Sequence, residues 1–158
     1  MGAVDILVNN AAKYEIKDTI FTITSEEIGK TFEVNVKATM LMIKAYVKRY
    51  KERSGVYGRI TNLSTDSAQA FAGQIAYGSS KAAIEAFTRS ITIEIGGLGI
   101  TINAVAPVPT QTGYIDEELE QIVLPLIPLG RLGQPVDIAN TIVYLASKKA
   151  EWLTGHFS

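Results

Sequence analysis

The sequence has no cysteine, and this absence excludes disulfide bonds, thiolate catalysis and zinc sites built on cysteine ligands. Its single histidine, His156, stands near the C-terminal end without obvious partner ligands, so we expect neither a metal site nor a histidine-dependent catalytic triad. Long apolar runs are also absent, because the longest ones have only the length of a strand. The sequence therefore predicts no signal peptide and no membrane span, with the cytoplasm as the expected location.

The chain also lacks a large net charge of either sign. It carries 15 basic and 16 acidic residues, which gives a net charge of −1. Because a nucleic-acid-binding protein usually shows a basic surface, we expect no nucleic-acid partner. The densest basic run, at residues 44–53, falls where a helix is expected to end, and lysine and arginine complement the helix dipole there. A length of 158 residues, 47% of them hydrophobic, is typical of one globular domain over residues 1–158.

Apolar segments of strand length alternate along the chain with longer segments of helical periodicity. Buried strands are predicted at residues 4–12, 58–64 and 99–107. Helices are predicted at residues 24–53, 77–96 and 134–147, with a short acidic helix at 116–123. This order predicts an α/β fold in which parallel strands are joined by right-handed helical crossovers.

Polar residues follow each predicted strand. Ligands of parallel sheets bind beyond the carboxyl ends of the strands, so these residues are the first candidates for a functional site. They are Asn9 and Asn10 after the first strand, Ser64, Thr65 and Asp66 after the second, and residues 107–112 after the third.

The stretch AYGSSK places Tyr77 one helical turn before Lys81, so both side chains are predicted on one face of a helix. A free tyrosine has a pKa of about 10, and a nearby ammonium favours the phenolate and lowers that pKa. Such a pair can act as a general acid–base. The same spacing also fits two ordinary surface residues near a helix N-terminus, and the spacing alone does not separate the two interpretations.

Two further polar residues favour the catalytic interpretation. Ser64 stands at the carboxyl end of the second strand, thirteen residues before Tyr77, where a hydroxyl can bind a substrate carbonyl oxygen. Its structural alternative is a turn or a helix cap. Asn35 stands at the edge of the first helix's apolar face, where a polar amide needs hydrogen-bond partners. That amide could serve catalysis or simply satisfy the backbone of a loop.

Several motifs resemble the short-chain dehydrogenase/reductase family in their order and gaps: DILVNNAA, Asn35, Ser64, YGSSK and NAVAPVPTQT. The C-terminal PLGRLGQPVDIANTIVYLASKKAEWLTG is similar to the bacterial oxoacyl-carrier-protein reductase and glucose dehydrogenase-like members. This resemblance covers essentially the whole chain. It implies a Rossmann-like three-layer fold and an NAD(P)-dependent oxidoreductase that interconverts a small-molecule carbonyl and a secondary alcohol, in the manner of a 3-oxoacyl-carrier-protein reductase. NADP is preferred over NAD, and a homo-oligomer would form through the helices at about 25–53 and 77–96.

The resemblance also implies a role for each matching residue. Tyr77 would be the catalytic acid–base, Lys81 would lower its pKa and hold the nicotinamide ribose, and Ser64 would orient the carbonyl. Asn35 would anchor a water that relays protons to Lys81. Besides Tyr77 and Lys81, the cofactor would contact Asn10, Ala11, Ala12, Pro107, Val108, Thr110 and Thr112. Residues 110–130 would form a mobile substrate lid.

The sequence departs from the family pattern in three places. It has no T-G-x-x-x-G-x-G segment, whose glycines let the backbone approach a pyrophosphate, and no residue that would choose between NAD and NADP. We therefore expect a fold that is incomplete at its first strands and its last strand, with an unpaired apolar edge on the strand at 5–10. Val108 stands where glycine is usual and would crowd the nicotinamide ring or shift the lid. Ala12 also replaces a common glycine.

These departures leave a second hypothesis open. The chain would then be a truncated, catalytically impaired member of the family that acts as an oligomerisation or interaction partner. Its two long helices would provide the interface.

Overall fold

The computed structural model describes residues 3–15, 18–53, 57–70 and 72–156. Its strands are β1 (Ile6–Asn9), β2 (Gly58–Leu63) and β3 (Ile100–Val105). Its α-helices are α1 (Ser25–Phe32), α2 (Thr39–Glu52), α3 (Ile75–Ile95), α4 (Glu117–Val123) and α5 (Pro135–Ala146). A π-helical segment, η1 (Glu33–Ala38), joins α1 to α2, and short 3₁₀ turns occur at η2 (Asp66–Ala68), η3 (Gly96–Leu98), η4 (Leu124–Leu126) and η5 (Lys148–Ala150).

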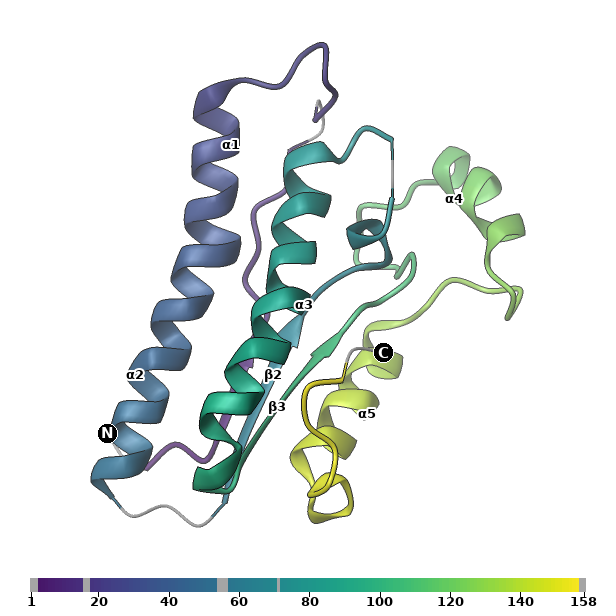
Figure 1. Ribbon diagram of the computed structural model, residues 1–158. Coiled ribbons are helices and arrows are strands. Elements are labelled where there is room, and N and C mark those ends of the chain that lie inside the picture. Colours follow the sequence, from purple (N-terminus) through teal and green to yellow (C-terminus); the bar gives the residue numbers. More distant parts are fainter. Residues whose placement is uncertain (1–2, 16–17, 54–56, 71, 157–158) are drawn as a thin grey trace.

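The three strands form one parallel sheet in the order β1-β2-β3 (Figure 1). Ile6 pairs with Arg59 on one side of β2, and Gly58 pairs with Ile100 on the other. Every residue of β2 and β3 is buried, whereas β1 alternates between exposed and half-buried residues. Among the described residues β1 pairs only with β2, so the predicted unpaired edge is present, with Ile6 44% and Val8 39% exposed.

Helices cover both faces of the sheet (Figure 1) and give it the three layers of the predicted α/β fold. One face packs against α2 and α3 in a core that holds Ile43, Tyr46, Tyr50, Ile60, Ile84, Phe87, Ile95, Ile100 and Ile102. The other face packs against α5 through Leu63, Val105, Leu145 and Ala150. Neighbouring strand residues point to opposite faces, so β2 and β3 supply apolar side chains to both cores. Burying one such side chain stabilises the fold by about 1.5–3 kcal/mol.

The predicted capping box opens α1. Thr24 Oγ1 accepts a hydrogen bond from the Glu27 N–H at 3.2 Å, and Glu27 Oε2 accepts one from the Thr24 N–H at 2.9 Å. The helix predicted at 24–53 is not continuous, however, because η1 interrupts it around Asn35. At the start of α2, Thr39 Oγ1 donates to the carbonyl oxygen of Asn35 at 2.8 Å. Periodicity alone does not distinguish a π-helical turn from an α-helical one, and such turns are frequent at functional sites.

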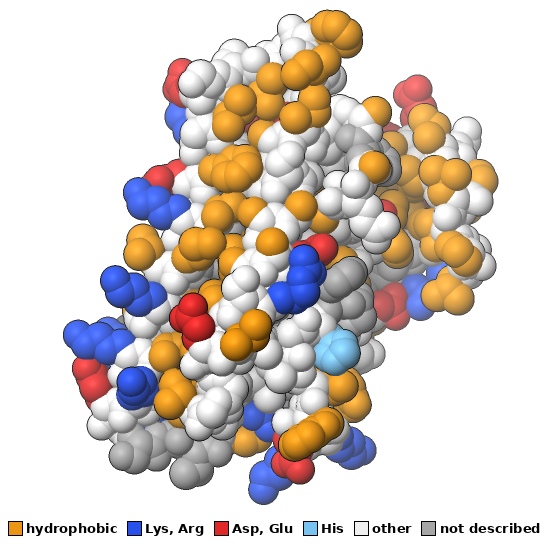
Figure 2. Space-filling model, viewed as in Figure 1, with side chains coloured by type: hydrophobic (Ala, Val, Ile, Leu, Met, Phe, Trp, Pro, Cys, Tyr) orange, Lys and Arg blue, Asp and Glu red, His pale blue; other side chains and the backbone are white. Residues whose placement is uncertain are grey.

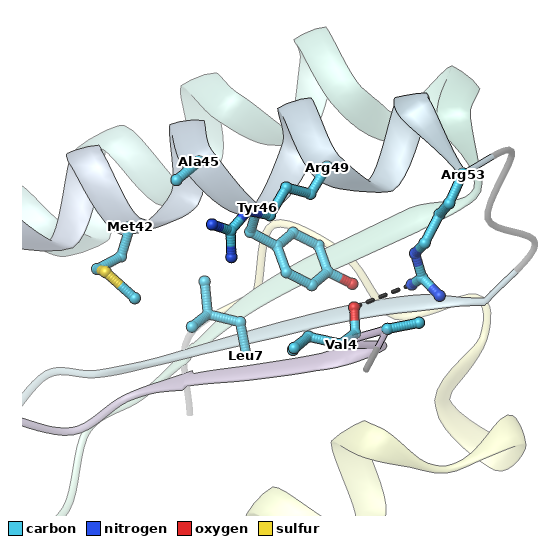
Figure 3. A pocket seen from close by; sticks show the side chains of 8 residues that line it. Val4, Leu7, Met42, Ala45, Tyr46, Arg49 and Arg53 are labelled. Carbon is cyan, nitrogen blue, oxygen red and sulfur yellow. Dashed lines mark hydrogen bonds between the residues drawn. The ribbon is translucent and has the colours of Figure 1, made fainter. Parts of the chain in front are cut away.

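A narrow apolar groove lies between β1 and α2 (Figure 3). It is lined by Ala3, Val4, Leu7, Met42, Ala45, Tyr46, Arg49 and Arg53. The Tyr46 hydroxyl donates to the carbonyl of Asp5 at 2.6 Å, and Arg53 Nη2 donates to the carbonyl of Val4 at 2.9 Å. These two bonds tie the amino end of the edge strand to α2.

Candidate active site

Tyr77 and Lys81 lie in the first two turns of α3, beside the carboxyl end of β2. Lys81 is only 2% exposed, and its Nζ lies 5.6 Å from the centroid of the Tyr77 ring. That Nζ donates one of its three protons to the carbonyl oxygen of Leu63, the last residue of β2, at 2.6 Å. The structure therefore brings together the two residues that the AYGSSK stretch pointed to, and anchors the ammonium on the sheet.

Burial governs the ionisation of both side chains. It lowers the pKa of Lys81 to about 8, because a buried ammonium loses hydration. It raises the pKa of Tyr77, and the nearby Asp66 carboxylate and Tyr14 phenol raise that pKa further. The spacing predicted that the ammonium lowers the pKa of Tyr77; in the structure that pKa is raised instead, and desolvation of the phenol is the largest cause. The phenol is consequently protonated at neutral pH.

Ser64 does not hydrogen-bond to Tyr77. Its Oγ donates to Glu85 Oε1 at 2.6 Å and contacts the carbonyl of Lys81 at 3.4 Å, and the residue is 4% exposed. Glu85 lies one helical turn beyond Lys81 on the same face of α3, so the Ser64 hydroxyl is directed to a point two turns along the helix from Tyr77. The sequence analysis missed Glu85, because nothing local marks a helix glutamate as the partner of a strand-end serine.

The segment after Ser64 approaches Tyr77 more closely. In η2 the carbonyl oxygen of Ser67 packs on Gly78, where an added Cβ would lie only 2.6 Å from that oxygen. Asp66 is near enough to Tyr77 to raise its pKa, and its N–H donates to the carbonyl of Pro107 at 3.2 Å. The loops after β2 and β3 therefore meet beside the phenol.

Asn35 is fully buried and bonds to two partners. Its Oδ1 accepts from the Lys13 N–H at 2.7 Å, and its Nδ2 donates to the Lys13 carbonyl at 3.0 Å and to Ser80 Oγ at 2.9 Å. Ser80 Oγ donates in turn to the Tyr77 carbonyl at 2.7 Å. The side chain thus satisfies the backbone of the loop after β1, which was one of the two alternatives. A water relay to Lys81 stays a prediction.

The residues expected to contact a cofactor lie in the loops at the carboxyl ends of β1 and β3. Asn10, Ala11 and Ala12 are exposed and directly follow β1. Pro107, Val108, Thr110 and Thr112 follow β3, and Val108 is 46% exposed. Because the carboxyl ends of parallel strands share one edge of the sheet, both loops lie on the same side as Tyr77.

The donor set fits the nicotinamide-ribose part of a dinucleotide. Lys81 Nζ has two protons beyond the one given to Leu63, and the Tyr77 phenol is beside it, so both can bind ribose hydroxyls. The 158 residues contain no glycine-rich pyrophosphate loop. The contacts of the sequence-predicted cofactor residues with such a group stay a prediction.

The expected lid at 110–130 has a packed base and a small core. Gln111 N–H donates to the Gly133 carbonyl at 2.9 Å, and Gly133 N–H donates to the Pro109 carbonyl at 3.0 Å. Inside this closed loop, Val123, Ile127 and Leu132 form a buried apolar cluster that includes part of α4. The mobility of the segment stays a prediction.

Two residues near Tyr77 were missed by the sequence analysis. The Tyr14 ring meets the Tyr77 ring edge to face, with centroids 5.2 Å apart and planes at 85°. Asp18 accepts hydrogen bonds from the N–H groups of Ala76 and Tyr77. Neither residue stands in a local pattern, because the contacts form only when the loop after β1 folds onto α3.

Within the described part of the chain, no three histidine, aspartate or glutamate side chains cluster as metal ligands. The same part contains no helix whose length and apolarity would suffice to span a bilayer.

Comparison with known proteins gives matches along the whole chain. A family model described as Enoyl-(Acyl carrier protein) reductase matches residues 1–157. The uncharacterized oxidoreductase YjdA of Bacillus subtilis is 36% identical over 156 residues, which cover 98% of this chain and 62% of that protein. The 3-oxoacyl-[acyl-carrier-protein] reductase FabG of Staphylococcus aureus is 38% identical over 159 residues, with 98% and 63% covered.

Solved structures agree with this result. A short chain dehydrogenase/reductase family protein is 33% identical and superposes with a TM-score of 0.86 over 99% of this chain and 65% of that chain. A 4-hydroxyisoleucine dehydrogenase complexed with NADH and succinate is 28% identical, with a TM-score of 0.92 over 98% of this chain and 65% of that one. The chain therefore spans less than two thirds of the length of the proteins that it matches here.

Proposed function

The chain belongs to the short-chain dehydrogenase/reductase family, and we propose that it acts as an NAD(P)-dependent oxidoreductase that interconverts a carbonyl and a secondary alcohol. The observation that carries this proposal is the Tyr77 phenol beside the buried Lys81 ammonium, at the carboxyl end of β2. A half-buried phenol next to a lysine is a proton donor placed where parallel sheets bind ligands.

In the reductive direction, Tyr77 Oη gives its proton to the substrate oxygen as a carbon–hydrogen bond forms at the carbonyl carbon. The nicotinamide cofactor, when bound, supplies the hydride for that bond and accepts it in the reverse direction. The raised pKa of Tyr77 keeps the phenol protonated before the reaction. Lys81, with a pKa near 8, remains mostly charged at neutral pH, stabilises the phenolate that results and can return a proton to it.

The remaining roles are proposed on the family resemblance. Ser64 orients the substrate carbonyl, which requires its hydroxyl to turn from Glu85 toward the substrate oxygen. Asn35 anchors the water that relays protons to Lys81. Asn10, Ala11, Ala12, Pro107, Val108, Thr110 and Thr112 contact the cofactor, and residues 110–130 close over the substrate.

The proposals for the cofactor and the substrate class rest on similarity to relatives. The solved relatives include one complexed with NADH and an angucycline C-6 ketoreductase with bound NADP, so the likeness supports either nucleotide. We keep NADP as the preferred one. Similarity to FabG of Staphylococcus aureus supports a 3-oxoacyl-carrier-protein type of substrate. A cytoplasmic location remains a prediction of the composition.

The decisive experiment follows cofactor binding and turnover in the wild type and in Tyr77→Phe. NADPH and NADH are titrated into the protein by fluorescence, and oxidation of the bound nucleotide is followed with a 3-oxoacyl thioester. We expect Tyr77→Phe to keep nucleotide affinity and to lose about 10²–10⁴-fold in kcat, because it keeps the ring but loses the proton. Undiminished turnover in Tyr77→Phe would contradict the acid–base role.

A second candidate function is supported by the surface. Figure 2 shows hydrophobic side chains gathered over α1, α2 and α3. Apart from Met42, which lines the groove against β1, the exposed apolar residues of the first two helices and the segment between them are Ile28, Val34, Met40 and Leu41. We propose this face as a homo-oligomer interface in the active enzyme. If the folded protein binds neither nucleotide, the same face favours the alternative, a non-catalytic oligomerisation partner.

A further inference from the structure

Asp18 is a buried carboxylate in the segment between β1 and α1, and only 3% of it is exposed. Its Oδ1 accepts a hydrogen bond from the Ala76 N–H and its Oδ2 accepts one from the Tyr77 N–H, each at 2.8 Å. Its carbonyl oxygen accepts a third from the Ile75 N–H at 3.1 Å. Asp18 therefore receives the first three N–H groups of α3.

These bonds replace a cap that α3 does not supply itself. The N-cap residue Gln74 makes no side-chain capping bond. The first N–H groups of a helix have no intrahelical acceptor, and an aspartate there also complements the positive end of the helix dipole. In most helices that residue is adjacent in sequence, whereas Asp18 lies 58 positions before Ala76. The start of α3 is thus held in place by the loop between β1 and α1.

Tyr77 is the third residue of α3, and several contacts converge on it. Asp18 holds its N–H, Ser80 Oγ donates to its carbonyl at 2.7 Å, and the Tyr14 ring packs edge-on against its ring. Among these contacts only the one to Asp18 is a charge-assisted hydrogen bond, which is roughly twice as strong as a neutral one. Asp18 also holds the neighbouring Ala76, so it fixes the whole first turn.

Lys81 is held differently. It lies in the second turn of α3 and is anchored on β2 through the Leu63 carbonyl. If the first turn frays, Tyr77 moves while Lys81 stays on the sheet. The distance between the phenol and the ammonium therefore depends on the cap.

We infer that Asp18 is a positioning residue for Tyr77, which sets the phenol against Lys81 by capping the first turn of α3. The inference rests on the proposed function where it treats Tyr77 as the acid–base. The claim that Asp18 caps α3 and positions the phenol does not depend on that function. In enzymes a displacement of about 1 Å at the reacting group can lower the rate by about 10²-fold. Asp18 touches neither the phenol nor a substrate, so it acts only through the backbone of Tyr77.

Amide hydrogen exchange measures the cap directly. In Asp18→Ala we expect the Ala76 and Tyr77 amides to exchange at least tenfold faster than in the wild type, while amides beyond Lys81 keep their protection. Asp18→Asn retains one acceptor oxygen and places an NH₂ group against the other backbone amide. We therefore expect only one of the Ala76 and Tyr77 amides to exchange faster. Thr24→Ala is the matched control, because it removes the cap of α1 and leaves Asp18 in place.

The pKa of the Tyr77 phenol, measured by titration, gives a second readout. A loss of stability elsewhere in the protein would not change it. Its resonance in ¹³C-tyrosine-labelled protein is identified by its absence in Tyr77→Phe. The groups that face it are Asp66 from η2, Tyr14 from the loop after β1 and Lys81 from α3. Since burial is the main cause of its raised pKa, a displaced Tyr77 should titrate at lower pH in Asp18→Ala, and Thr24→Ala should leave it unchanged.

The inference is overturned if both Asp18 variants keep wild-type exchange at Ala76 and Tyr77, or if the amides open and the phenol titrates as before. Should Asp18→Ala fail to fold, the isosteric Asp18→Asn decides between these outcomes alone. Neither readout needs turnover, so a protein without oxidoreductase activity refutes the proposed function and leaves this test intact. In an active protein, Asp18→Ala is expected to lower kcat about 10²-fold with little change in the KM for nucleotide.

Discussion

At the residue scale, the candidate site depends on two side chains whose ionisation is set by burial. Lys81 is among the most buried charged residues of the protein, and its pKa is lowered to about 8. The pKa of Tyr77 is raised by burial and by Asp66 and Tyr14. The pKa of the ammonium therefore lies below that of the phenol, and the neutral phenol is the resting form. This arrangement suits proton donation to a carbonyl oxygen.

The lowered pKa of Lys81 predicts a pH-dependent stability. The unfolded chain keeps the lysine proton up to about pH 10.4, whereas the folded protein releases it near pH 8. Between these values the unfolded state binds more protons, so the free energy of unfolding rises with pH by up to about 1.4 kcal/mol per unit. Urea denaturation at pH 7.5 and 9.5 should show the wild type gaining about 2 kcal/mol relative to Lys81→Met.

The pH range of this comparison ends below pH 10 because tyrosine ionisation affects the free energy of unfolding above that value. Tyr46 has its pKa raised to about 12 by burial, and that of Tyr77 is also raised, so both make the folded state less stable once free tyrosine ionises. Lys48→Met removes an exposed lysine of α2 and serves as the control, with the wild-type pH dependence expected. A pH-independent difference between the wild type and Lys81→Met would refute the lowered pKa.

At the scale of the element, two helices illustrate opposite demands on glycine. Gly29 in α1 has no heavy atom within 4 Å of where a Cβ would stand. Gly78 in the first turn of α3 has the Ser67 carbonyl oxygen only 2.6 Å from that point. Glycine destabilises a helix by about 1 kcal/mol relative to alanine. No contact explains the glycine at position 29, whereas Gly78 permits η2 to approach Tyr77.

This contrast predicts opposite effects of the same substitution. Gly29→Ala should stabilise the protein by about 0.5–1 kcal/mol, because it raises helix propensity without a clash. Gly78→Ala should destabilise it by about 1–3 kcal/mol, because a backbone oxygen must move. Urea denaturation of both variants measures the two effects. Equal stabilisation by the two substitutions would show that η2 does not pack on α3 as described.

At the scale of the whole molecule, two stretches of exposed apolar surface bear on association. One is the edge of β1, with its exposed Ile6 and Val8 and the adjoining groove (Figure 3). The other is the face of α1, η1 and α2 that is proposed as a homo-oligomer interface (Figure 2). An unpaired apolar strand edge favours association with another strand, and an apolar helix face favours packing against a second copy.

The proposed helix interface predicts a charge-sensitive oligomer. Val34 in η1 and Leu41 in α2 are both apolar and exposed, Leu41 to 53%. Leu41→Glu should shift the assembly toward the monomer, because a desolvated carboxylate at the interface is costly. Light scattering after gel filtration measures the mass. Val143→Glu, at an equally apolar exposed position of α5, is the control and should leave the mass unchanged.

The order of elements and the Tyr77–Lys81 pair could be predicted because both depend on residues close in sequence. Strand and helix periodicities gave the elements within a few residues, and the Thr24–Glu27 box marked the start of α1. The interruption at η1 was missed, since it lies where Asn35 is buried against the loop after β1, a contact that periodicity does not reveal. The direction of the Tyr77 pKa was also missed, because spacing reveals the ammonium but not the loss of water around the phenol.

The α/β alternation, the helical turn that separates Tyr77 from Lys81, and the polar residues at the strand ends all follow from the amino-acid sequence alone. Local periodicity and spacing suffice for these features. Only the tertiary structure decided that Ser64 faces Glu85, that Asn35 holds Lys13, and that Asp18 caps α3. Each of these contacts joins segments distant in the chain, and a polar group selects its partner only when burial removes water as the alternative.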